Sequence, residues 1–107
     1  MPEVADWQQR LEDEEEPVYP IGVVADLLNV SVQVVRRYDE EDMVAPDRSQ
    51  GGQRRYSRRD IARLAHILQL SEEGISTAGI RRILALESEL ASAREAQANG
   101  RKRARSD

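Results

Sequence analysis

The sequence predicts a mainly α-helical domain with one small β-hairpin and a short C-terminal helix. Three observations indicate this fold class. Apolar residues recur at helical spacing in two short segments before residue 43, a segment with paired glycines follows at residues 44–57, and two more helical segments occupy residues 57–86. The 107 residues include one Trp and no Phe, so the core must be aliphatic and small.

The first two helices have the spacing of a helix-turn-helix. The first is expected over residues 21–28, with apolar residues at Val24, Leu27 and Leu28. Asn29 tolerates the left-handed conformation that a tight turn requires, and Ser31 stands at an N-cap position, so the second helix should begin at Val32. The small Ala25 would let the helices cross closely. A generic pair of amphipathic helices is the alternative.

Residues 44–57 predict a hairpin, which would serve as the wing of a winged helix-turn-helix. Gly51 and Gly52 permit the chain to reverse between two short strands. Strand alternation places Arg54 and Tyr56 on one face and Arg55 on the other. A positive charge and a hydroxyl donor on the same face suit phosphate oxygens. A solvated basic hairpin is the alternative.

The helices after the wing have clear start and stop signals. Ser57 and Asp60 form a capping box at the start of the third helix, which should end near Glu73 before Gly74. Ser76 or Thr77 should cap the fourth helix. We assign residues 17–86 to the winged helix-turn-helix domain.

The two ends of the chain have different compositions. Residues 1–16 are expected to be a disordered acidic tail, although the helical spacing of Val4, Trp7 and Leu11 also allows a docking segment. Residues 87–99 are a short helical extension that stops at Asn99-Gly100, and residues 100–107 are a basic tail. A candidate dimer seam begins before the extension and continues into it, at Ile83, Leu86, Leu90 and Ala93. Packing of this helix on its own domain is equally open.

The distribution of charge favours a nucleic-acid partner despite a net charge of −4. Residues 1–16 carry seven acids and one Arg, whereas residues 48–63 carry six Arg and only Asp60 as an acid.

Several function classes are disfavoured by what the sequence lacks. It has no Cys and a single histidine, His66, so no metal site or catalytic constellation stands out, and we expect no enzyme activity and no cofactor. The N-terminus has no apolar h-region and no apolar run reaches membrane-spanning length, so a cytoplasmic protein is expected.

From Tyr19 to about Leu86 the chain resembles the MerR family of bacterial regulators. The motifs are IGVVADLLNVSVQVVRRYDEEDMVAPDR, GGQRRYSRRDIARL and GISTAGIRRIL. The heat-shock repressor subgroup is most similar, through DR-x-x-GG-x-RRYS-x-RDI and AGIRRI. Two features depart from the family pattern. Val34 replaces a usual polar residue, and little sequence follows Leu86 for the long helix that pairs two subunits.

The resemblance implies a dimer that places two recognition helices in successive major grooves of an inverted repeat. It implies phosphate contacts by Arg36 and Tyr38 of the second helix and by Arg54 and Tyr56 of the wing. The subgroup also suggests a protein partner such as a DnaK-type chaperone. No small-molecule ligand is expected.

The exposed N-terminal part of the second helix should carry base readout. Gln33 can bond adenine and Arg37 can bond guanine, while Arg36 is assigned to phosphate. Ser31 and Arg55 complete the expected phosphate contacts. The acidic run 39–42 is expected to face solvent away from DNA or to pair with Arg48.

The leading hypothesis is a sequence-specific DNA-binding transcriptional regulator, a repressor that binds an inverted-repeat operator of double-stranded DNA as a homodimer. Two alternatives stay open. One is an excisionase-like or architectural protein that bends DNA. The other is a protein-interaction module that uses the acidic N-terminal tail.

Overall fold

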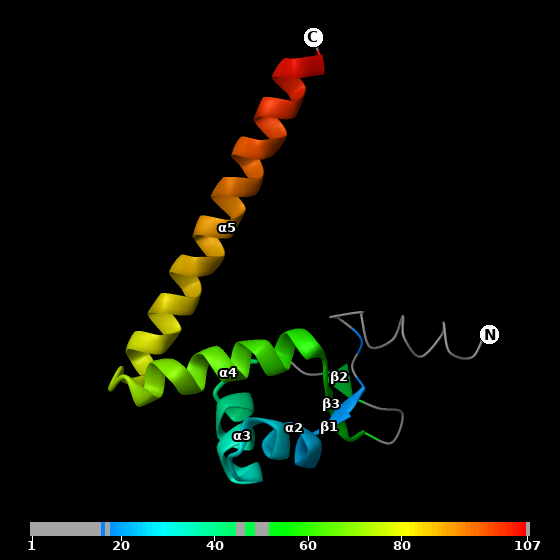
Figure 1. Cartoon of the computed structure of the whole chain (residues 1–107), viewed down its shortest axis with the longest axis vertical. Coiled ribbons are helices and arrows are strands. Elements are labelled where there is room, and N and C mark those ends of the chain that lie inside the picture. Colours follow the sequence, from blue (N-terminus) through cyan, green and yellow to red (C-terminus); the bar gives the residue numbers. More distant parts are fainter. Residues whose placement is uncertain (1–15, 17, 45–46, 49–51, 107) are drawn as a thin grey trace, which may run out of the picture. The chain divides into compact units, whose positions relative to one another are not determined.

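The computed structural model describes residue 16 and residues 18–44, 47–48 and 52–106, which form helices α2–α5 and strands β1–β3 (Figure 1). The chain divides into two compact units, an N-terminal unit of residues 1–69 and a C-terminal unit of residues 70–107. The mainly helical fold with a small hairpin wing is confirmed. The division falls inside α4, and the domain boundary expected at residue 86 stays a prediction.

Helices α2 (Ile21–Leu28) and α3 (Val32–Glu40) form the expected helix-turn-helix. Asn29 is left-handed, at φ 57° and ψ 44°, and its N–H donates to the carbonyls at the end of α2. The Ser31 hydroxyl accepts the Val34 N–H at 3.4 Å and caps α3. Ala25 is buried, as close crossing of the helices requires. Figure 1 shows α2 beside both α3 and the strands.

A second left-handed residue ends α3. Asp42 has φ 58°, and the Met43 N–H donates to the Tyr38 carbonyl at 3.0 Å across it. The Met43 carbonyl in turn accepts a hydrogen bond of 2.6 Å from Nε of Arg63 in α4. The turn after α3 is therefore tied to the helix that follows the wing.

The wing belongs to a sheet of three short strands. Strand β3 (Arg54–Tyr56) lies in the centre and pairs antiparallel with β2 (Asp47–Arg48) and with β1 (Tyr19–Pro20). Gly52 has φ 82° in the hairpin, as a tight reversal requires, while Gly51 lies outside the described residues. Strand β1 was not predicted, because a two-residue strand that includes a proline has no periodic signal.

Helix α4 (Arg58–Glu72) begins with the predicted capping box. The Ser57 N–H donates to the Asp60 carboxylate at 2.9 Å, and the Asp60 N–H donates to the Ser57 hydroxyl at 3.0 Å. Gly74 follows the helix at φ 87°, which confirms the predicted stop.

The core of the N-terminal unit draws on α2, α3, β3 and α4 and on the turn after α3. Its buried apolar residues are Val24, Ala25, Val35, Tyr38, Met43, Val44, Tyr56, Leu64 and Ile67. Two of the largest are the tyrosines of α3 and β3, which fill volume that Phe provides in other proteins. The buried polar residues are Asp39 and Ser57.

In the C-terminal unit, α5 (Thr77–Ser106) is capped by Ser76, whose hydroxyl accepts the Gly79 N–H at 3.1 Å. A Cβ on Gly79 would lie 2.8 Å from Cγ2 of Ile75, so the cap excludes a larger residue there. The helix stop expected at Asn99-Gly100 is wrong, since α5 continues to Ser106. The C-terminal helix is therefore 30 residues long and not short as predicted. Glycine lowers helix stability by about 1 kcal/mol, which biases the backbone but does not end a helix without a chain reversal.

None of the helices in the described part of the chain is long and apolar enough to cross a membrane. Among the same residues, no group of three or more His, Asp or Glu side chains is placed to hold a metal ion.

Candidate nucleic-acid interface

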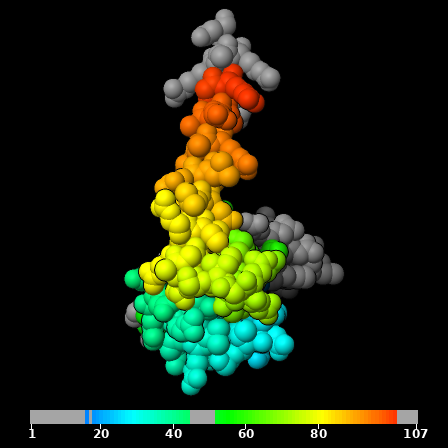
Figure 2. Space-filling model, turned by 90° about the vertical axis from the view of Figure 1, so that its left-hand side faces the viewer, coloured from blue at the N-terminus to red at the C-terminus, as the bar shows by residue number. Residues whose placement is uncertain are grey.

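Helix α3 presents one polar face to solvent. Gln33, Arg36 and Arg37 are exposed together with Glu40, whereas Val35 and Tyr38 are buried on the other face. Figure 2 shows α3, coloured cyan to green, at the surface of the N-terminal unit. The helix therefore offers an amide and two guanidinium groups within two turns, which are the donors that major-groove readout uses.

The Arg37 guanidinium lies over the ring of the next residue in α3, Tyr38. The guanidinium carbon lies 5.0 Å from the centre of the Tyr38 ring. A cation–π contact at an exposed site stabilises by about 0.5–1 kcal/mol, whereas a bidentate bond to guanine is worth about 1–3 kcal/mol. The contact can orient Arg37 without preventing it from turning to a base.

Asp39 joins α3 to the wing. One oxygen of its carboxylate, Oδ2, accepts the Tyr56 hydroxyl at 2.8 Å and lies 2.5 Å from Nη1 of Arg54. The Asp39 side chain is 7% exposed and the Arg54 side chain 38% exposed. Arg54 and Tyr56 thus share one face of β3, as strand alternation predicted, and that face meets the end of α3.

The shared carboxylate affects the titration of both partners. Burial raises the pKa of Tyr56 well above its ordinary value of 10.0, and the hydrogen bond to Asp39 raises it further. The hydrogen bond and charge of Asp39 also raise the pKa of Arg54. Tyr56 is therefore a neutral donor and Arg54 a permanent cation at neutral pH.

A groove of about 490 Å³ lies where α3 meets the wing. It brings Arg36 of α3 to the same hollow as Arg54 of β3. Its lining residues are Pro20, Ile21, Arg36, Asp39, Glu40, Gln53 and Arg54. Two arginines that share a groove suit a phosphate group that passes between helix and wing.

The predicted site residues fall into two groups. Ser31, Gln33, Arg36 and Arg37 are exposed on or next to α3, and Arg54 lies on the rim of the groove. Ser31 accepts the Val34 N–H, and its own hydroxyl proton can still be donated. Arg55 is half-buried, between Pro20 and Asp47 in the strand register.

The two tyrosines lie differently from what the sequence predicted, and for Tyr56 the predicted phosphate contact is contradicted. Both were expected to contact phosphate, but both are buried, and the Tyr56 hydroxyl donates to Asp39. A phosphate contact requires an accessible donor, and the Tyr56 hydroxyl is not one in this conformation, whereas a phosphate contact by Tyr38 stays a prediction. Each tyrosine supports an arginine: Tyr38 lies under Arg37, and Tyr56 shares the carboxylate that holds Arg54.

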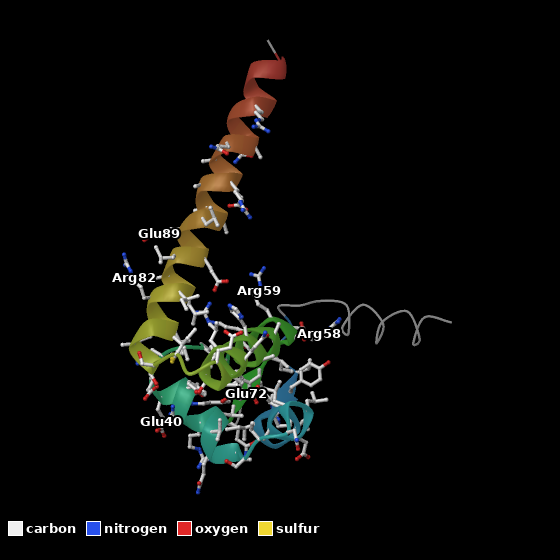
Figure 3. All side chains as sticks on the ribbon, turned by 60° about the vertical axis from the view of Figure 1, so that its left-hand side comes forward. Glu40, Arg58, Arg59, Glu72, Arg82 and Glu89 are labelled. Carbon is white, nitrogen blue, oxygen red and sulfur yellow. The ribbon has the colours of Figure 1, made fainter. Side chains whose placement is uncertain are left out.

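The acidic run after Tyr38 also differs from expectation. Asp39 was expected to face solvent or pair with Arg48, and it is instead the buried partner of Arg54 and Tyr56. Its position four residues after Val35 places it on the buried face, a signal that the sequence analysis did not use. Glu40 and Asp42 are exposed, and Figure 3 shows Glu40 at the end of α3. The Arg48 side chain lies outside the described residues.

A further residue was missed. Gln53 lines the groove beside Arg54, where its amide can donate to phosphate. It lies between the glycine pair and the first strand residue, where sequence patterns predict a turn and not a ligand contact.

The helix-turn-helix, the three-stranded wing and the arginine-lined groove between them define a winged helix-turn-helix protein. Residues 19–87 match the sequence profile of the MerR HTH family of regulatory proteins. The match covers more than half of the chain, which therefore belongs to this family of DNA-binding transcription regulators.

Individual relatives agree with this assignment. The chain is 49% identical over 79 residues to the Streptomyces coelicolor protein named as heat shock protein HspR, which covers 73% of this chain and 52% of the relative. It is 37% identical over 71 residues to the HTH-type transcriptional regulator GlnR of Bacillus anthracis, which covers 66% and 55%. The chain spans about half the length of these curated relatives.

Solved structures show the same fold. One is HiNmlR, a MerR family regulator that lacks the sensor domain and was crystallised with promoter DNA. Its TM-score is 0.59 at 23% identity, over 79% of this chain and 76% of that one. A second, a MerR family regulator from Bacillus cereus, has a TM-score of 0.58 at 24% identity and covers 79% and 70%.

Proposed function

We propose that this chain is a sequence-specific repressor that binds an inverted-repeat operator as a homodimer. The observation that carries the proposal is the groove in which Arg36 of α3 and Arg54 of β3 face the same space. A helix in the major groove and a wing on the adjacent backbone would then hold one phosphate between them. Such a function acts on chromosomal DNA and implies the cytoplasm.

The residues that we assign to DNA have two kinds of role. Gln33 and Arg37 read base edges, because they project from the first two turns of α3. Arg36, Arg54 and Ser31 contact phosphate and fix the register of the helix. Arg55, on the opposite face of β3, contacts a neighbouring phosphate. No role in catalysis is proposed for any residue.

Two parts of the proposal, repression and the protein partner, rest on the similarity to known relatives. The heat shock name of the Streptomyces coelicolor relative supports a role in a stress response. A DnaK-type chaperone is the corresponding protein partner, and a protein signal also suits a chain with no Cys. Binding to purified chaperone, measured by calorimetry with and without operator DNA, tests this part separately.

Two experiments in sequence test the function. Bound sequences are first selected from random DNA, and DNase I footprinting then follows on the promoter next to the gene that encodes this protein. We expect one discrete inverted repeat, protected over two half-sites about one helical turn apart. Extended protection without a preferred sequence would identify an architectural DNA-bending protein instead. Absence of salt-dependent binding would leave a protein-interaction module.

A further inference from the structure

An apolar groove lies on the N-terminal unit apart from the proposed DNA contacts. It has a volume of about 280 Å³ and is lined by Tyr19, Leu27, Arg58, Ile61, Ala62 and Ala65. None of these residues lines the groove between α3 and the wing. Ile61, Ala62 and Ala65 form a stripe along one face of α4, and Leu27 contributes the last turn of α2.

Two large apolar side chains beside this groove are exposed to solvent. Leu27 is 61% exposed, and Val23, one turn earlier on α2, is 42% exposed. In the described part of the N-terminal unit these are the two large hydrophobic residues that face solvent. Adjacent exposed apolar residues beside a hollow mark a surface that another segment covers.

The lining of the groove carries one positive charge, the guanidinium of Arg58. Figure 3 shows Arg58 and its neighbour Arg59 at the start of α4. An occupant should therefore combine apolar anchors with negative charge. Only the positive charge of the rim matters here, and neither arginine needs to be without another partner.

The N-terminal segment has this composition. Trp7, the single tryptophan of the chain, is flanked at helical spacing by Val4 and Leu11, and residues 1–16 carry seven acids. The segment leads directly into Tyr19, which is itself part of the groove. The chain between Trp7 and Tyr19 can span at most about 40 Å, and such a tether gives an effective concentration of roughly millimolar.

We propose that residues 1–15 dock in cis on this groove, with Trp7 inserted between α2 and α4 and the acidic run 12–16 beside Arg58. The groove supplies apolar walls from Leu27, Ile61 and Ala65, and the rim supplies the opposite charge. An indole fits such a hollow because one ring buries a large area and loses little conformational freedom. The proposal stands apart from DNA binding.

Trp7 fluorescence in the full chain tests the docking, because no other tryptophan contributes. We expect emission at short wavelength and weak quenching by acrylamide. Ala65→Glu, an exposed position in the groove, should shift the emission to long wavelength and restore quenching. Gln69→Glu makes an equal charge change on an exposed position of α4 outside the groove and should leave both unchanged. Emission of the unsubstituted chain equal to that of the urea-unfolded chain would overturn the proposal.

A cross-link separates docking in cis from docking on a second copy. The chain has no Cys, so Gln8→Cys with Ala62→Cys is the one pair that a short bismaleimide can join. The proposal expects an intramolecular product with the mass of one chain, and less of it with Gln8→Cys and Gln69→Cys. A product with the mass of two chains, or equal yields from both pairs, would contradict it.

Discussion

The Tyr56 hydroxyl donates to the Asp39 carboxylate at 2.8 Å and so links the central strand of the wing to the recognition helix. Both residues are buried, and Arg54 approaches the same oxygen from the solvent side. A carboxylate at the end of a DNA-binding helix would normally repel phosphate. Here it is withdrawn from solvent, and it holds the arginine that we assign to phosphate.

Asp39→Ala should destabilise the fold much more than removal of its neighbour Glu40. It leaves the buried Tyr56 hydroxyl without an acceptor, which costs about 1–3 kcal/mol. Loss of the pair with Arg54 adds little, because solvent screens that guanidinium. Glu40→Ala removes an exposed acid and should change stability by no more than about 0.5 kcal/mol. Urea unfolding measures both. Equal effects would mean that the Asp39–Tyr56 bond contributes nothing.

The raised pKa of Tyr56 predicts a loss of stability in alkali. The folded state holds the phenol proton more tightly than the unfolded state, whose pKa is about 10. The contribution is therefore complete below pH 10 and is lost as pH rises above it. Tyr56→Phe should remove this part of the slope of unfolding free energy against pH. Tyrosinate absorbance should show one of the three tyrosines titrating late.

Arg54→Ala and Arg37→Ala should differ in kind. Arg54 lines the groove that we assign to phosphate, so its loss should weaken binding to all sequences and reduce the salt slope by about one unit. Arg37 lies on the exposed face of α3, so its loss should cost about 1–3 kcal/mol on the operator and relax one base pair per half-site. Selection from randomised DNA at two salt concentrations compares them. A changed sequence preference with Arg54→Ala alone would reverse the assignment.

Asp42→Asn should stabilise the protein. Asp42 adopts φ 58° just after α3, where its negative charge opposes the helix dipole. Asparagine tolerates the same conformation without the charge, and the gain should be about 0.3–1 kcal/mol at low salt. Thermal unfolding at two ionic strengths measures it. Because salt screens the dipole, a gain that persists unchanged at 1 M salt would point to another cause.

The C-terminal helix should form a loose dimer. Leu86 and Leu90 are 46% and 50% exposed on α5, but the seam continues only to Ala93 before the polar Gln97. We expect a monomer–dimer equilibrium that DNA shifts towards the dimer. Leu90→Glu should leave a monomer, whereas Ala91→Glu, next to it but off the seam, should not. Analytical ultracentrifugation tests both, and a dimer that resists dilution to nanomolar concentration would contradict the expectation.

Local interactions account for what the sequence determined about this protein. Asn29, Ser31, the Ser57–Asp60 capping box and Gly74 all occupy their predicted places, because each acts on backbone atoms within a few residues of itself. The motifs that resemble the MerR family lie on these same elements. Alternation along β3 correctly paired Arg54 with Tyr56 for the same reason.

Contacts between distant segments were decided by the tertiary structure alone. Three features depend on elements many residues apart in the sequence. They are the pairing of β1 with β3, the burial of Tyr38 and Tyr56, and the partners of Asp39. From the sequence alone, Asp39 is expected to be a solvated acid and Tyr56 a phosphate donor, because each side chain is polar. Packing the end of α3 against the wing removes both from water. The buried carboxylate and the buried hydroxyl are stable there because they bond each other and because Arg54 pairs with the carboxylate.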